Sequence, residues 1–223
     1  MHILCLHGMG TNNQVFEIQT AALRYELGDR HTYEFVEGTI PCPIASEISS
    51  LFNPDDSYYS YFDPNSVNSA LEALRQLEEY IVAEGPFDGV LAFSQGAGLV
   101  AMHIIYQSLQ NPRRNLMPPF KFAIFISSIP VYDLRGVENG TGIRKLDPAL
   151  DGHLIRIPTT HIWGEHEVHK ADGELLESLC EQKLTATFVH DGDHEVPGLS
   201  GKSAVTGTVN AMRRAIFNAL LLE

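Results

Sequence analysis

Residues 87–106 read Phe-Asp-Gly-Val-Leu-Ala-Phe-Ser-Gln-Gly-Ala-Gly-Leu-Val-Ala-Met-His-Ile-Ile-Tyr, and this stretch decides the fold. The short apolar run Val90–Phe93 predicts a buried strand, and the pattern after Ser94 predicts a helix. A serine at such a strand-to-helix turn lies in a tight bend that presents its hydroxyl at the sheet edge. Ala92 and Gly96, two positions before and after the serine, are small enough to leave room for that bend.

The composition favours one globular domain over residues 1–223. The hydrophobic fraction is 44% and the charged fraction 19%, which are ordinary values. A net charge of −13 argues against nucleic acid and anionic membranes as partners. No apolar run is long enough to span a bilayer, and the first residues lack the basic flank of a signal peptide. The three cysteines, Cys5, Cys42 and Cys180, lack metal-binding spacing. We therefore expect a cytoplasmic, disulfide-free protein.

Strand signals alternate with helical patterns along the chain. This order predicts an α/β fold, with a mostly parallel sheet of about six strands, helices on both faces and no large cap domain. The expected strands are Ile3–Leu6, Tyr33–Glu37, Gly89–Phe93, Phe122–Ser127, Thr160–Trp163 and Thr185–Val189. The expected helices cover residues 15–28, 66–84, 95–110, 171–182 and 203–221.

Two segments, 53–64 and 130–158, lack the periodicity of either element. Long irregular segments in a compact domain are usually functional walls or lids, so both are candidate substrate walls. A mobile surface loop is the alternative for segment 130–158, and packing beneath a loop is the alternative for the aromatic residues of segment 53–64. The candidate substrate-binding side chains are Tyr58, Tyr59, Tyr61, Phe62 and Trp163.

The serine needs a histidine partner, because its hydroxyl is a poor nucleophile until an imidazole takes its proton. In α/β-hydrolases this histidine follows the last strand. Two histidines lie there, His190 and His194. His194 is favoured because it lies on a glycine-containing loop that can turn back over the sheet edge.

A carboxylate must fix the tautomer of that imidazole and stabilise its charged form. In α/β-hydrolases the acid comes between the serine and the histidine, after a later strand. Glu167, three residues after Gly164, is favoured for this position. Glu165 and Asp172 remain alternatives.

Two backbone N–H groups are expected to stabilise a tetrahedral oxyanion. The first strand runs into His7-Gly8-Met9-Gly10, a turn that commonly directs an N–H at the reaction centre. The candidate donors are therefore Met9 and Gln95, and His7 is expected to brace the loop.

Clustered histidines also raise a metal site as an alternative: His161, His166, His169, His190 and His194. No carboxylate or cysteine completes an ordered ligand set, and the H-E-x-x-H motif is missing from the sequence. We therefore expect no metal and no other cofactor.

Five segments together resemble the FSH serine hydrolase family, small α/β-hydrolases without a large cap. They are residues 3–10, 17–23, 86–97, 161–167 and 191–197. The chain departs from that family at Ala92 and Asp193, where glycine is usual, and at Glu167, where aspartate is more common.

The resemblance implies hydrolysis of a carboxylic ester or thioester through an acyl-enzyme, and some relatives are similar to thioesterases that release polyketides from carrier proteins. We therefore expect a small ester or acyl thioester substrate, with an acyl carrier domain of a polyketide synthase as a candidate partner. Docking of that domain would require basic residues at the pocket mouth: Arg113, Arg114, Arg144 and Lys145. A general short-chain carboxylesterase and a non-catalytic ligand-binding protein on the same fold are the alternatives.

Overall fold

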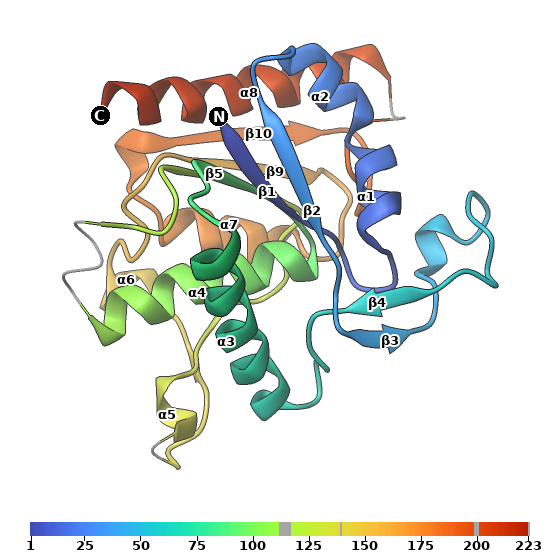
Figure 1. Cartoon of the computed structure of the whole chain (residues 1–223). Helices are drawn as coiled ribbons and strands as arrows, with labels where there is room; N and C mark the ends of the chain where they lie inside the picture. Colours follow the sequence, from blue (N-terminus) through green and yellow to red (C-terminus); the bar gives the residue numbers. More distant parts are fainter. Residues whose placement is uncertain (112–116, 139, 199–200, 223) are drawn as a thin grey trace.

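The computed structural model describes residues 1–111, 117–138, 140–198 and 201–222, and its centre is a six-stranded parallel sheet (Figure 1). The strand order is β10-β9-β6-β5-β1-β2. The six predicted strands are confirmed to within one residue at either end. They are β1 (His2–Leu6), β2 (Thr32–Val36), β5 (Gly89–Phe93), β6 (Phe122–Ile126), β9 (Thr159–Gly164) and β10 (Thr185–His190).

Helices cover both faces of this sheet because its strands are apolar on both sides. In β1, Ile3 and Cys5 belong to one apolar cluster, whereas Leu4 and Leu6 belong to the other. The first cluster is covered by α1 (Asn13–Gln19), α2 (Ala21–Leu27) and α8 (Lys202–Leu221). The second is covered by α3 (Val67–Glu84), α4 (Gln95–Gln110) and α7 (Lys170–Ser178). Figure 1 shows the two helical layers on opposite sides of the sheet.

Two helix predictions need correction. The single helix expected over 15–28 is broken between α1 and α2 at Thr20, whose buried hydroxyl donates to the carbonyl of Phe16 at 2.8 Å. Such a bond offers the backbone an alternative to the helical ladder. The helix expected over 171–182 ends at Ser178, and a short 3₁₀ helix, η3 (Gln182–Leu184), precedes β10.

The two irregular segments contain short elements. Within 53–64, β4 (Tyr58–Ser60) pairs with β3 (Ile40–Cys42) in an antiparallel hairpin, whose connection holds the 3₁₀ helix η1 (Ser46–Ile48). Within 130–158 the structure contains β7 (Tyr132–Asp133), α5 (Arg135–Glu138), β8 (Arg144–Lys145) and α6 (Pro148–Asp151). Cys5, Cys42 and Cys180 are free thiols. Of the helices in the described part of the chain, none combines the length and apolarity that crossing a membrane requires.

Candidate active site

Ser94 lies in the predicted bend between β5 and α4. Its backbone is strained, with φ 53° and ψ −116°, and its N–H donates to the carbonyl of Ile126 in the neighbouring strand at 2.9 Å. Ser94 is buried, with 9% of its surface exposed. Ala92, which replaces the usual glycine, is fully buried and fits within the sheet.

Two glycines bring the end of β1 against this bend. A Cβ on Gly96 would lie 2.7 Å from the carbonyl oxygens of Leu6 and His7, and a Cβ on Gly8 would lie 3.3 Å from the Cβ of Ser94. Neither position has room for a larger residue. The loop after β1 and the serine turn therefore form one packed unit.

His194 is the histidine that the fold brings to Ser94. Its Nε2 lies 2.9 Å from the Ser94 Oγ, and its ring packs on Phe93 with the centroids 5.1 Å apart. The alternative, His190, is buried at the end of β10, and its Nδ1 accepts from the N–H of Gly192 at 3.2 Å. Burial lowers the pKa of His190. His190 thus shapes the turn that carries His194.

Glu167 lies on the Nδ1 side of the His194 imidazole. Its Oε1 lies 3.3 Å from the His194 Nδ1, and its Oε2 accepts from the hydroxyl of Ser127 at 2.6 Å and from the N–H of Gly164 at 3.0 Å. The side chain is fully buried. Burial by itself raises the pKa of this carboxyl, but the hydrogen bonds from His194, Ser127 and Gly164 outweigh it and leave the pKa below its usual value. The carboxylate is therefore held in its charged form.

The two alternative acids have other partners. Glu165 accepts from the ammonium of Lys170 at 2.9 Å, and Asp172 lies 3.1 Å from the Nδ1 of His169. The His169 ring in turn meets the His194 ring edge-on, with centroids 5.5 Å apart. Asp172 thus reaches the site only through a second histidine.

Sequence reasoning missed Ser127, which it assigned to the end of a strand. The available signal was a polar residue closing an otherwise apolar run, in the strand that follows the serine turn along the chain. Adjacency of β6 to β5 brings this hydroxyl to the same sheet edge.

The candidate oxyanion donors lie in the two segments that meet at Ser94, the start of α4 and the loop after β1. Gln95 is the first residue of α4, where the N–H has no acceptor within its own helix. In the loop after β1, the N–H of Gly10 donates to the carbonyl of Tyr59 at 3.0 Å and that of Thr11 to the carbonyl of Gly8 at 3.3 Å. Met9 lies between the two, 47% exposed.

Hydrogen bonds of two buried side chains hold the loop after β1 and the start of α4 in place. The imidazole of His7 is fully buried, and its Nε2 accepts from the N–H of Gly38 at 2.9 Å. The side chain of Gln95 accepts from the N–H of Tyr61 at 2.8 Å and donates to the carbonyl of Phe62 at 2.8 Å. These bonds join the chain after β4 to the start of α4.

Four of the five aromatic candidates for substrate binding pack into the interior. Tyr58, Tyr61, Phe62 and Trp163 are at most 7% exposed. The hydroxyl of Tyr58 donates to the carbonyl of Asn53, and that of Tyr61 to the carbonyl of Val36. Tyr59 is partly exposed, and its backbone pairs with the loop after β1. Tyr58 in β4 and Tyr61 and Phe62 just after it thus pack inward, as the alternative for segment 53–64 expects.

The histidines raised as metal ligands serve separate local purposes. Burial lowers the pKa of His161 to about 3, and its Nε2 lies 3.1 Å from the Oγ1 of Thr159. His166 is exposed, whereas His190 and His194 lie in the contacts given above. In the part of the chain that the structure describes, no three metal-binding side chains converge.

The basic residues proposed to receive a carrier domain divide into two groups. Arg113 and Arg114 lie outside the described residues. The guanidinium of Arg144 pairs with Asp151 at 2.7 Å and with Asp133 at 3.2 Å, and Lys145 follows it in β8. The charge of Arg144 is thus neutralised within segment 130–158.

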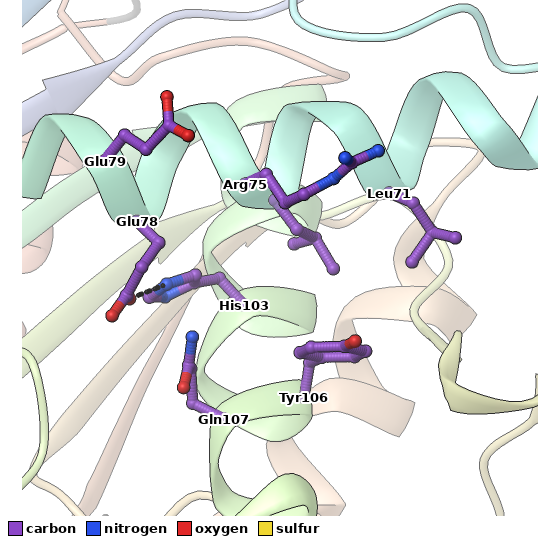
Figure 2. A pocket seen from close by; sticks show the side chains of 8 residues that line it. Leu71, Arg75, Glu78, Glu79, His103, Tyr106 and Gln107 are labelled. Atoms are coloured by element: carbon purple, nitrogen blue, oxygen red, sulfur yellow. Dashed lines mark hydrogen bonds and ion pairs between the residues drawn. The ribbon is translucent and has the colours of Figure 1, made fainter. Parts of the chain in front are cut away.

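A cavity of about 190 Å³ lies between α3 and α4 (Figure 2). His103 is buried there, with its Nε2 2.8 Å from the Glu78 Oε2, as the dashed line in Figure 2 marks. The remaining lining residues are Leu71, Leu74, Arg75, Glu79, Tyr106 and Gln107. This cavity shares no residue with the site around Ser94.

Comparison with solved structures shows the α/β-hydrolase fold. A carboxylesterase from Mesorhizobium loti aligns with a TM-score of 0.59 and 16% identity over 95% of this chain and 88% of its own. A carboxylesterase from Bacillus cereus aligns with a TM-score of 0.60 and 14% identity over 95% and 87%.

Comparison of sequences is more specific. The chain is 39% identical over 218 residues to esterase FPY3 of Fusarium mangiferae, covering 97% of this chain and 95% of that protein. It is 30% identical over 210 residues to hydrolase phiM of Talaromyces stipitatus, covering 88% and 81%. The family described as serine hydrolase (FSH1) matches residues 1–204. With the serine turn in place and the sequence matched over nearly its whole length, the chain belongs to the FSH1 serine hydrolase family.

Proposed function

We propose that the chain hydrolyses a carboxylic ester or thioester through an acyl-enzyme, with Ser94, His194 and Glu167 as the catalytic triad. The observation that carries the proposal is the pair of contacts of one imidazole. Its Nε2 lies 2.9 Å from the Ser94 Oγ, and its Nδ1 lies 3.3 Å from the Glu167 Oε1. This is the geometry of a serine-histidine-carboxylate triad, which recurs on unrelated folds.

The reaction proceeds in two halves. Ser94 Oγ attacks the acyl carbon while its proton passes to the His194 Nε2, and Glu167 stabilises the imidazolium that forms. The same proton then goes to the departing alcohol or thiol, leaving an acyl ester on Ser94. Water then attacks that ester while its proton passes to His194, and the imidazolium returns a proton to the Ser94 Oγ as the carboxylic acid is released.

The N–H groups of Met9 and Gln95 are the proposed oxyanion hole. The first position of α4 and the turn after β1 support this role, because Gln95 directly follows Ser94 and the turn packs against Ser94 at Gly8. The positive end of the α4 dipole adds to the stabilisation. One donor of this kind is typically responsible for about 3–4 kcal/mol of transition-state stabilisation.

The proposed substrate class is a largely apolar acyl ester or thioester. The names of the relatives, an esterase and a hydrolase, support ester cleavage. We further propose release of a polyketide or similar acyl chain from a carrier protein, supported by the family resemblance and by the shared chemistry of esters and thioesters at such a site. A short-chain carboxylesterase is the second candidate, and the inward packing of Tyr58, Tyr61 and Phe62 favours it.

A fluorophosphonate probe tests the proposed triad. We expect one covalent adduct per chain, located on Ser94 by peptide mass spectrometry and missing from Ser94→Ala. A folded wild-type protein that forms no adduct would support the non-catalytic ligand-binding alternative.

The substrate class needs a second assay. The hydrolysis of p-nitrophenyl esters is compared with that of acyl-N-acetylcysteamine thioesters of rising chain length. Polyketide release predicts efficient thioester cleavage that improves with chain length. Activity confined to short esters would favour the carboxylesterase.

A further inference from the structure

Ser127 and Ser94 both have a positive φ, which is uncommon for a residue other than glycine. Among the residues that the structure describes, these two serines are the non-glycine residues with positive φ, at 48° and 53°. Each directly follows its strand, and those strands, β6 and β5, are neighbours. The N–H of Ser127 donates to the carbonyl of Ile162 at 2.7 Å, as that of Ser94 donates to Ile126. Strained residues of this kind concentrate at functional sites.

The hydroxyl of Ser127 donates its hydrogen bond to the carboxylate of Glu167. Ser127 is 1% exposed, and its Oγ donates to the Glu167 Oε2 at 2.6 Å. The N–H of Gly164 donates to the same oxygen at 3.0 Å. Two donors therefore hold Oε2, and Oε1 is left to face His194. A glutamate has one more rotatable bond than an aspartate, and this clamp restricts it.

We propose that Ser127 is a positioning residue of the hydrolase site, whose hydroxyl aims the Glu167 carboxylate at His194 from a backbone held at positive φ. The inference rests on the proposed function, because a positioning role exists only in a working triad. A neutral hydroxyl favours the ionised carboxylate without cancelling its charge, so the full charge remains available to the imidazolium. Without the hydroxyl, one of the two restraints on the carboxylate is lost.

Two substitutions separate the hydroxyl from the backbone strain. Ser127→Ala and Ser127→Gly both remove the hydroxyl, but only glycine adopts positive φ without strain. We expect kcat for p-nitrophenyl acetate to fall about tenfold in both variants, as for loss of a hydrogen bond to a charged group, with KM within about twofold. A glycine variant with wild-type kcat beside an impaired alanine variant would overturn the inference, because strain would then be the cause.

A double-mutant cycle tests whether Ser127 acts through Glu167. In a Glu167→Ala background, we expect Ser127→Gly to leave the rate of fluorophosphonate labelling of Ser94 unchanged, because no carboxylate remains to be aimed. An equal loss in both backgrounds would indicate a merely structural role and overturn the inference. Circular dichroism and the midpoint of thermal unfolding serve as folding controls.

The failures of the two proposals are distinguishable. If wild type is labelled at Ser94 and Ser127→Gly retains its kcat, the inference fails and the proposed function stands. If folded wild type is neither labelled nor active, both proposals fail.

Discussion

At the scale of single residues, the two carboxylate oxygens of Glu167, the proposed triad acid, have separate contacts. Its Oε2 is anchored between the ends of β6 and β9, and its Oε1 extends to the His194 Nδ1 at 3.3 Å. Both contacts depend on the length of the glutamate side chain. The carboxylate of Asp172, the alternative acid, lies instead 3.1 Å from the Nδ1 of His169.

Shortening or neutralising this acid should therefore impair catalysis to different degrees. Glu167→Asp keeps the charge but withdraws it from His194, and we expect kcat to fall about 10-fold to 100-fold. Glu167→Gln stabilises the wrong imidazole tautomer and should cost up to about 10⁴-fold. Initial rates with p-nitrophenyl acetate measure both. Wild-type kcat in Glu167→Gln would exclude Glu167 as the triad acid.

The buried His161 leads to a separate prediction, about how the free energy of unfolding depends on pH. Burial lowers its pKa to about 3, below the value of about 6.5 in an unfolded chain, so the unfolded state binds a proton first. Its contribution to stability is therefore complete above pH 6.5 and declines by about 1.4 kcal/mol per pH unit between about pH 6.5 and 3. Urea unfolding of wild type and His161→Leu at several pH values should show a shallower decline in the variant. Parallel declines would contradict this account.

At the scale of elements, the serine turn and the loop after β1 depend on each other. Gly96 brings α4 within contact of the carbonyls of Leu6 and His7. The same approach brings the turn that carries Met9 against the start of α4, where Gln95 lies, so both proposed oxyanion donors depend on it. The serine turn is thus formed by two strands and one helix rather than by residues 92–96 alone.

Gly96→Ala should push the start of α4 away from the end of β1. The added Cβ would lie 2.7 Å from backbone oxygens that cannot rotate away, so we expect about 1–3 kcal/mol of destabilisation and slower labelling of Ser94. Gly173→Ala is the matched control, since it is also a helix glycine. There the new Cβ meets only the Trp163 ring, at 3.1 Å. Equal stability and labelling rates in the two variants would show that the close approach is unimportant.

The elements differ in how far the sequence alone could predict them. The central strands were predictable because buried parallel strands are continuous apolar runs. The helix break at Thr20 was not, because it depends on a hydroxyl that bonds the Phe16 carbonyl in a buried setting. The β3–β4 hairpin was missed because β3 has three residues, one of them Pro41.

At the scale of the whole molecule, chain order predicted the three side chains that meet at the sheet edge. Ser94 and His194 are 100 residues apart in sequence and lie 2.9 Å apart in space. The contact between Ser127 and Glu167 could not be predicted in this way, because it depends on how two loop ends approach each other in space. The inward packing of the aromatic rings in segment 53–64 could not be predicted either. It accompanies the β3–β4 hairpin, and no local sequence pattern predicted that hairpin.

The central claim is that Ser94 and His194 act as one unit, and kinetic non-additivity tests it most directly. The measurement is kcat for p-nitrophenyl acetate in Ser94→Ala, His194→Ala and the double variant. Residues that act together lose nearly all their effect when either is removed, so we predict that the double variant is no slower than either single variant. Losses that multiply in the double variant, or a His194→Ala protein close to wild-type kcat, would contradict the account.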